Sequence, residues 1–192
     1  MTEILNPDRP MRADARRNHA RILAAARELF ASDEPDAQID EVARRAGVGV
    51  GTVYRHFPDK EALMGELVRQ RFGIFNEHLA AALADECSEP FDTLADALRA
   101  NAASVAEDAA TRFSFSSGGE RVFAHAAVEM DEFMRLGALL VERAQAAGQL
   151  RPKFETQDIP MLMCGVCATI DKRGAGWDWK RLLEIVIAGM RA

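Results

Sequence analysis

Apolar residues recur every three or four positions along almost all of this 192-residue chain, which is the spacing of amphipathic α-helices. Ile22, Leu23, Ala26 and Phe30 form the first such series. No alternating segment long enough for a strand appears, and no repeat of fixed period is visible. Because 48% of the residues are hydrophobic and 28% are charged, the chain has enough apolar surface to bury a core. We therefore predict an all-α globular protein.

Turn and capping residues divide the pattern into separate helices. Gly47 and Gly148 stand where left-handed C-terminal stops are expected, and Asp36, Asp59 and Asp178 are suited to cap N-termini. We predict a loop at residues 114–119, whose sequence is S-F-S-S-G-G. The predicted helices cover about 14–31, 36–46, 49–56, 59–84, 90–105, 122–147, 158–170 and 178–190.

Charge is unevenly distributed along the chain. Residues 1–71 contain 12 basic and 12 acidic residues, so the net charge of -6 comes entirely from residues 72–192. Within the balanced part, six arginines lie between Arg9 and Arg27, where Asp14 is the only acid. A basic N-terminal arm therefore precedes an acidic remainder, which keeps nucleic acid open as a partner despite the overall sign.

Residues 39–63 carry the most specific pattern in the chain, I-D-E-V-A-R-R-A-G-V-G-V-G-T-V-Y-R-H-F-P-D-K-E-A-L. Two short helices meet here through Gly47 and the apolar Val48. Small or apolar residues occupy the positions where the helices would cross, and polar or aromatic ones occupy the outward positions of the second helix. This arrangement is typical of a helix-turn-helix, whose second helix enters the DNA major groove.

The same stretch resembles the tetracycline-repressor (TetR) family of transcriptional regulators. The likeness runs from Arg17 through Leu67 and includes A-x-x-L-F at 26–30, V-A-x-x-A-G-V at 42–48, G-T-V-Y-x-H-F at 51–57 and K-E-A-L at 60–63. The resemblance implies an all-helical homodimer in which three N-terminal helices bind DNA. It also implies that a larger C-terminal domain binds a small molecule and that the last two helices dimerise. We place the division at 1–58 and 59–192.

The expected function is a ligand-responsive repressor that binds a pseudo-palindromic double-stranded DNA operator. The effector is expected to be a small apolar molecule of unknown identity that releases the protein from DNA. Three sets of residues are candidates for these roles. DNA contacts are assigned to Arg17, Arg44, Gly49, Val50, Thr52, Tyr54, Arg55, His56 and Lys60. Effector contacts are assigned to Phe72, Phe75, Asn101, Phe123, His125 and Met130. The dimer interface is assigned to Met163, Val166, Cys167, Ile170, Leu182, Leu183, Val186 and Met190.

Two positions depart from the family pattern. Gly49 and Val50 stand where relatives often carry serine or glutamine, so base contacts are expected to be few and partly apolar, with thymine methyl groups as candidates. Asp40 occupies a position that is basic in some relatives, and we interpret it as a solvated charge near the helix start.

Other chemistry is weakly supported. The glycines at 47–51 match neither G-x-x-x-x-G-K-[ST] nor G-x-G-x-x-G and follow a helix, so a phosphate-binding loop is disfavoured. Cys164-x-x-Cys167 lacks a second ligand pair, and we favour core packing over zinc binding or thiol sensing. No catalytic constellation is visible, so we expect no enzyme, no cofactor and no metal. Two alternatives stay open. One is a regulator controlled by cysteine oxidation or by a partner protein, and the other, less favoured, is a helical enzyme.

Cysteine content and apolar run lengths indicate the compartment. Three cysteines are too few for a disulfide framework, and no apolar signal sequence is visible at the N-terminus. The longest uncharged apolar stretch, residues 159–170, is shorter than the roughly 20 residues of a membrane span. The expectation is a cytoplasmic protein without membrane association.

Overall fold

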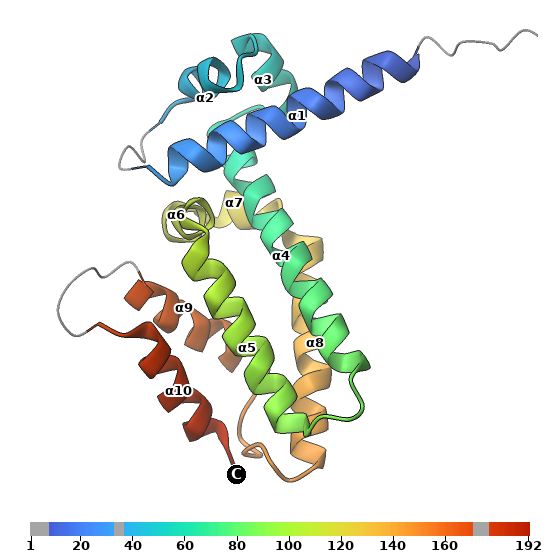
Figure 1. Ribbon diagram of the computed structural model, residues 1–192, viewed down its shortest axis with the longest axis vertical. Coiled ribbons are helices and arrows are strands. Elements are labelled where there is room, and N and C mark those ends of the chain that lie inside the picture. The colour runs from blue at the N-terminus through green and yellow to red at the C-terminus, as the bar shows by residue number, and fades with distance from the viewer. Residues whose placement is uncertain (1–7, 33–36, 171–176) are drawn as a thin grey trace, which may run out of the picture. The chain divides into compact units, whose positions relative to one another are not determined.

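The computed structural model describes residues 8–32, 37–170 and 177–192, with side chains from residue 13 onwards (Figure 1). Within these ranges every regular element is a helix, which confirms the all-α class. The helices are α1 (Asp8–Phe30), α2 (Ile39–Ala46), α3 (Val50–His56), α4 (Lys60–Ala84), α5 (Pro90–Glu107), α6 (Ala109–Ser117), α7 (Glu120–Ala124), α8 (Ala127–Ala146), α9 (Asp158–Ile170) and α10 (Trp179–Met190). Among the described helices, none combines the length and apolar character that crossing a membrane requires.

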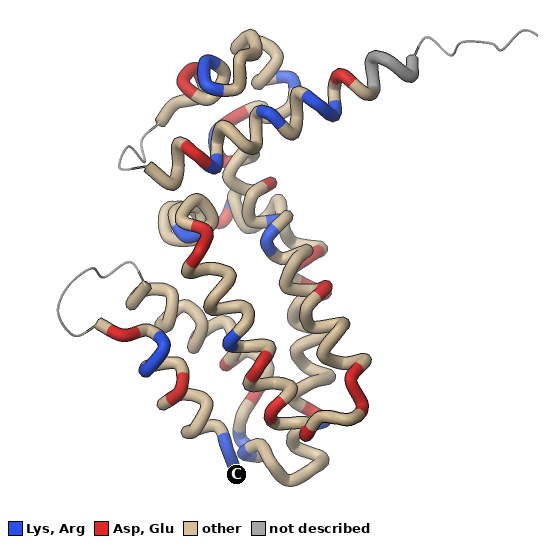
Figure 2. Tube along the Cα trace, viewed as in Figure 1, with Lys and Arg blue, Asp and Glu red and all other residues tan. Residues whose placement is uncertain are grey.

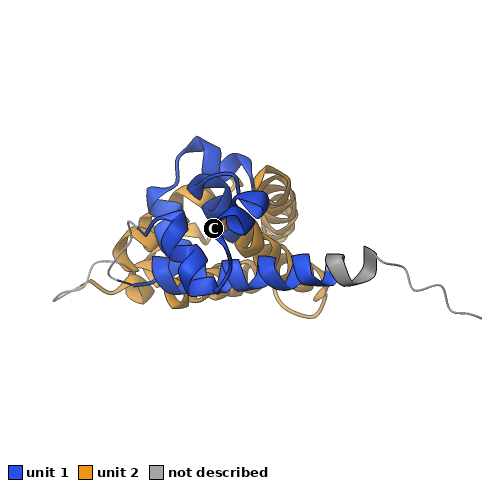
Figure 3. Cartoon of the chain, turned by 90° about the horizontal axis from the view of Figure 1, so that it is seen from above, with its two compact units in different colours: residues 1–67, 109–125 blue, residues 68–108, 126–192 orange. Residues whose placement is uncertain are grey.

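The chain forms two compact units, shown in different colours in Figure 3. Unit 1 comprises residues 1–67 and 109–125, and unit 2 comprises residues 68–108 and 126–192. This division differs from the expected one at residue 58, because α6 packs on α1 and the first two turns of α4 stay with the N-terminal helices. Phe30 of α1 and Phe113 of α6, with ring centroids 5.3 Å apart, are part of that packing.

Most of the predicted helix ends are found where the capping residues placed them. Gly47 adopts φ 63° and Gly148 adopts φ 69°, the left-handed conformation that favours glycine. The Asp59 carboxylate accepts the Ala62 N–H at 2.8 Å, and Asp178 accepts the N–H groups of Lys180 and Arg181. Asp36 lies outside the described residues.

Residues 114–126 differ from the prediction. The expected loop at 114–119 is largely helical, because α6 continues to Ser117 and the Ser114 hydroxyl donates back to Ala110 O at 2.9 Å. Only 118 and 119 separate α6 from α7, and a Cβ at Gly118 would lie 2.3 Å from Ser114 O. The expected single helix at 122–147 is interrupted between Ala124 and Ala127, where no glycine or proline signals a break.

Each unit has its own apolar core. Fully buried side chains in unit 1 include Ile22, Val42, Val53, Leu63 and Leu67 of α1 to α4, together with Val122 of α7. Those in unit 2 include Val68 of α4, Phe91, Leu94 and Val105 of α5, Leu140 of α8, and Leu150. The predicted amphipathic stripes therefore face inward within both units.

Candidate DNA-binding surface and effector site

The helix-turn-helix of unit 1 is held by apolar packing and by one contact at its turn. Val42 and Val53 are completely buried where α2 and α3 cross. Arg21 of α1 donates from Nη2 to Gly47 O at 3.1 Å. A Cβ at Gly47 would lie 2.8 Å from that same Nη2 atom, so glycine serves both the left-handed turn and the close approach of α1.

The outward face of α3 exposes apolar and aromatic groups. Val50 is 38% exposed and Tyr54 is 49% exposed, although α3 has only seven residues. Gly49 and Arg55 are also exposed, while Thr52 is half-buried. A short helix with this mixture at its surface suits contact with thymine methyl groups and phosphates in a major groove.

Arginines on this unit are held by nearby groups. Arg55 donates from Nη2 to Thr52 Oγ1 at 3.0 Å, so it bends back along α3. Arg44 donates to the Glu41 carboxylate, and this bond lowers the pKa of Glu41 and raises that of Arg44. Arg17 pairs in the same way with Asp14. Figure 2 shows these basic positions along α1 and at the end of α2.

His56 is partly buried at the end of α3. Its ring centroid lies 5.7 Å from that of His19, and His19 packs at 5.1 Å on Phe57. Burial lowers the pKa of His56, and the charges of His19 and Arg55 lower it further. The lowered pKa favours the neutral ring of His56, which lies beside His19 of α1.

Lys60, a predicted DNA contact, packs on aromatic rings of unit 1. Its Nζ atom lies 5.5 Å from the Phe30 ring centroid and 5.7 Å from that of Phe113. Lys60 is half-buried, and its ammonium group makes cation–π contacts with both rings. Its contact with DNA stays a prediction.

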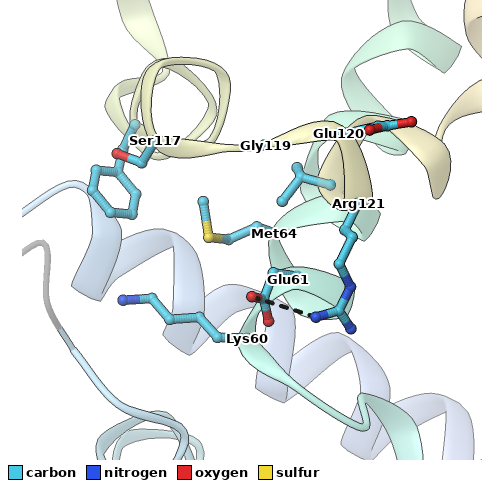
Figure 4. Close-up of a pocket in the computed structure, with 9 residues that line it drawn as sticks. Lys60, Glu61, Met64, Ser117, Gly119, Glu120 and Arg121 are labelled. Carbon is cyan, nitrogen blue, oxygen red and sulfur yellow. Dashed lines mark ion pairs between the residues drawn. The ribbon is translucent and has the colours of Figure 1, made fainter.

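Lys60 also borders a cavity of about 510 Å³ within unit 1 (Figure 4). Arg121 closes one side, where it pairs with Asp59 at 2.6 Å and with Glu61 at 3.7 Å. Met64 lies near the centre of the view. The lining residues are Lys60, Glu61, Met64, Phe113, Ser117, Gly119, Glu120, Arg121 and Val122, none of which belongs to the predicted effector set.

The predicted effector residues are divided between the two units. Phe123 and His125 belong to unit 1, where a Cβ at Gly65 would lie 2.5 Å from the His125 Cβ. His125 is exposed, and Phe123 stacks on Phe115. Phe72, Phe75, Asn101 and Met130 belong to unit 2.

Aromatic rings of unit 2 form a cluster between α4 and α8. The ring centroids of Phe72 and Phe75 are 5.8 Å apart, and that of Phe133 lies 5.4 Å from Phe72 and 6.0 Å from Phe75. The first two are predicted effector contacts, whereas Phe133 is not in the predicted set. Phe72 meets the other two rings edge to face, at interplanar angles of 84° and 73°, and Phe75 and Phe133 are buried, so the cluster forms an apolar wall inside unit 2.

Beside this cluster lies a buried ion pair that the sequence did not indicate. Arg71 of α4, only 8% exposed, donates to Ser104 and to Asp108, the residue that ends α5. Its guanidinium carbon also lies 5.8 Å from the Phe75 ring centroid. Buried charges are costly unless paired, so this network fixes α4 against the end of α5.

Three buried polar atoms have no hydrogen-bond partner among the described residues. They are Arg71 Nε, Asn76 Oδ1 and Asn101 Oδ1, and all three belong to unit 2. Asn101 is 3% exposed, whereas Asn76 is half-buried and donates from Nδ2 to Glu129 O at 2.9 Å. Unsatisfied buried groups are rare in folded proteins and call for a specific explanation.

The predicted dimer residues divide into buried and partly exposed ones. Val166, Leu183 and Met190 are at least 96% buried within unit 2, so in the protomer they belong to its core. Those that are partly exposed are Met163, Cys167, Ile170, Leu182 and Val186.

The most exposed apolar side chains of α9 and α10 are Met161, at 63%, and Ile185, at 59%. Cys164 is exposed and Cys167 is partly exposed, so the expected core packing of this pair is wrong for the protomer. Within the described residues no cluster suited to a metal ion is found.

Comparison with known proteins agrees with this architecture. Residues 22–67 match the family model for bacterial regulatory proteins of the tetR family, and residues 89–192 match the SbtR-like C-terminal domain of transcriptional regulators. An HTH-type transcriptional regulator of Staphylococcus aureus is 38% identical over 71 residues, which covers 35% of this chain and 37% of that protein. The aligned region thus spans little more than a third of this curated relative.

Solved structures match over most of the chain. A TetR transcription regulatory protein from Mycobacterium vanbaalenii is 29% identical, with 95% of this chain and 100% of that one covered and a TM-score of 0.59. The transcriptional regulator FadR from Bacillus subtilis in complex with stearoyl-CoA shares the fold, with 18% identity, coverage of 90% and 99%, and a TM-score of 0.71.

Unit 1, with its helix-turn-helix and exposed α3, thus defines a DNA-binding protein, and the matches define a transcriptional regulator. The chain belongs to the TetR family.

Proposed function

We propose that this regulator is a ligand-responsive repressor that binds a pseudo-palindromic operator as a homodimer and leaves it when a small apolar effector binds. The observation that carries the proposal is that the two units have different features suited to binding. Unit 1 exposes Val50 and Tyr54 on α3, whereas unit 2 contains an aromatic cluster and buried polar atoms without partners. Repression and release require one surface for DNA and one interior for a ligand.

The effector site is proposed in unit 2, around Phe72, Phe75 and Asn101. Met130, a flexible and half-buried side chain of α8, is suited to adjust to a ligand there. Phe123 and His125, which belong to unit 1, are kept as secondary candidates. The FadR regulator from Bacillus subtilis, which shares the fold, is in complex with stearoyl-CoA, a molecule with a long apolar chain, and this supports an effector with an apolar part.

The effect of effector binding in unit 2 is proposed to reach unit 1 through Arg71 and Asp108. Arg71 lies four residues after Leu67, the last residue of unit 1 in α4, and Asp108 directly precedes Ala109, where the chain returns to unit 1. The ion pair thus links both of these chain passages. An effector that alters this pair would change the constraint on α4 and α6 together.

The homodimer is proposed to form through the exposed apolar face of α9 and α10. Met161, Cys164 and Ile185 lie on this face, and Gly165 and Ala168 are small enough for close helix contact. A two-fold dimer would present two α3 helices about 34–36 Å apart, or a multiple of that distance, to successive major grooves.

The proposal is tested by selecting an operator from random duplex DNA with the full chain. Tyr54→Ala should weaken binding to the selected operator by about 5- to 100-fold, since loss of one good base or phosphate contact costs roughly 1–3 kcal/mol. The control is Val128→Ala, which truncates a 78% exposed side chain of unit 2 and should leave the affinity unchanged. Selection of no palindromic sequence, or an unaffected Tyr54→Ala variant, contradicts the proposal.

Thiol control is the second candidate, because Cys164 is exposed. Alkylation of the cysteines that prevents operator binding in the absence of any ligand would favour it. Unchanged binding by the alkylated protein would leave small-molecule control as the mechanism.

A further inference from the structure

The unpartnered polar atoms of unit 2 specify the chemistry of the effector, whose existence rests on the proposed function. Asn101 lies on α5 one turn before Ser104, and Ser104 accepts a hydrogen bond from Arg71. Residues three apart on a helix are neighbours on one face, about 5–6 Å apart between Cβ atoms. Asn101 therefore lies one turn from the residue through which α5 binds Arg71.

The missing partners are mainly hydrogen-bond donors. Asn76 Oδ1 and Asn101 Oδ1 are acceptors, and Arg71 Nε is the one donor among the unpartnered atoms of the described residues. A buried carbonyl oxygen without a donor costs about 1–3 kcal/mol. A ligand group that donates a hydrogen bond to Asn101 would recover that energy, whereas an ether or an alkane would not.

The same surroundings disfavour a charged ligand. The positive charge of Arg71 is already compensated by Asp108, so it does not attract a second carboxylate. Glu129 of α8, whose backbone oxygen accepts from Asn76, is paired with Arg69 at 2.8 Å. A further charge would be placed among paired ions without a counter-ion of its own, at a large desolvation cost.

Aromatic side chains supply the remaining contact surface. Phe72, Phe75 and Phe133 contact one another, and Arg71 lies over the face of Phe75. A buried cluster of this kind favours an apolar ligand body.

We infer that the effector is a neutral, predominantly apolar molecule with a hydroxyl group, a phenol or an alcohol, whose O–H donates to Asn101 Oδ1. The aromatic cluster holds its apolar body. The hydroxyl oxygen accepts from Arg71 Nε when it lies between the two residues, since a hydroxyl both donates and accepts.

Three matched probes test this class with the full chain. They are 4-hexylphenol, its methyl ether and 4-hexylbenzoate, whose affinities are measured by titration calorimetry. The phenol should bind about tenfold more tightly than either of the others, the size expected for one buried hydrogen bond. Equal affinity for phenol and ether, a preference for the benzoate, or no saturable binding of the phenol overturns the inference.

Variants of α5 test whether Asn101 is the residue that recognises the ligand hydroxyl. Asn101→Leu should bind phenol and ether equally, whereas Thr93→Val should keep the tenfold preference. Thr93 is a suitable control because it is buried on the same helix and its hydroxyl donates to Glu89 O. A tenfold preference that persists in Asn101→Leu overturns the assignment, and if that variant fails to fold, the wild-type comparison still decides the ligand class.

Operator binding separates this inference from the proposed function. If the protein prefers the phenol over the ether and the benzoate but its operator affinity is unchanged, the inferred ligand class stands. The proposed release from the operator by an effector is then contradicted. If the protein binds its operator and another molecule releases it, but the phenol is not preferred, the proposed function stands and the ligand class fails.

Discussion

The two units of this regulator differ in how fully their own residues satisfy buried polar atoms and cover large apolar side chains. Unit 1 buries an apolar core, and the unpartnered buried polar atoms of the described residues all lie outside it. Unit 2 contains Arg71 Nε, Asn76 Oδ1 and Asn101 Oδ1 without partners and exposes Met161 and Ile185. The exposed groups of unit 1 suit the DNA that the family binds. In unit 2, by contrast, polar atoms of the interior lack hydrogen-bond partners and large apolar side chains of the surface are uncovered.

This difference indicates which interactions each unit still lacks. Buried polar atoms are normally hydrogen-bonded and large apolar side chains are normally covered, so departures from both rules in one unit point to binding partners. A ligand would satisfy the interior of unit 2, and a second copy of the chain would cover α9 and α10. Variants of each unit can test this contrast.

The largest expected effect comes from Met161→Arg, which places a charge on the exposed face of α9. The variant should become monomeric, and its operator affinity should fall about 100-fold or more because the two DNA-binding units lose their linkage. Sedimentation and operator titration measure both changes. Val128→Arg changes a still more exposed position on α8 and should leave both the assembly and the operator affinity unchanged. A Met161→Arg variant that stays dimeric would place the interface elsewhere.

A second prediction compares the two halves of α4. Gly65→Ala introduces a Cβ 2.5 Å from the His125 Cβ in unit 1 and should destabilise the protein by about 1–3 kcal/mol. Gly73→Ala, in the unit 2 half, meets nothing within 4 Å and should stabilise it by roughly 0.5–1 kcal/mol. Urea unfolding of both variants measures the difference. Equal effects would mean that His125 moves easily away from the added methyl group.

Helix capping provides a third comparison. Asp59→Ala and Asp178→Ala each remove a side-chain cap, at a cost of about 0.5–2 kcal/mol. The Ala62 N–H bond lowers the pKa of Asp59, with a further contribution from Arg121.

The stabilisation from Asp59 is therefore present at neutral pH and is lost as the pH falls through its lowered pKa. Unfolding series between pH 7 and pH 2.5 should show wild type and Asp59→Ala converging in acid. A constant difference over that range would contradict the role of the ionised carboxylate.

The smallest expected effect concerns His56. Its lowered pKa means that the unfolded chain binds more protons than the folded one just below pH 6.5, so stability rises with pH in that window. Acidification from pH 7.5 to pH 5.5 should lower the thermal midpoint of wild type more than that of His56→Gln. Parallel pH profiles would show that the burial of His56 does not affect its titration.

Much of unit 1 could be predicted from the sequence because its signals are local. Gly47 marks a left-handed turn, Asp59 caps the helix that follows it, and Val42 and Val53 stand at fixed spacings where α2 and α3 cross. Each of these features depends on neighbours within a few residues. The helix at 114–117 was missed because its serines satisfy their hydroxyls within the helix, as Ser114 does with Ala110 O, and composition alone favours a loop there.

The packing of unit 2 and the residue boundaries of unit 1 depend on contacts between segments that are distant in the sequence. Such contacts could not be predicted from the sequence alone. The helical class, the family and the exposed character of Tyr54 follow from periodicity and motif spacing, which local backbone geometry dictates. Only the tertiary structure paired Arg71 with Asp108 across 37 positions, left Asn101 Oδ1 without a donor and turned Lys60 toward Phe30 and Phe113. Charges and hydrogen bonds of this kind are decided by which helices become neighbours, because a helix pattern states that a face is buried but not what lies against it.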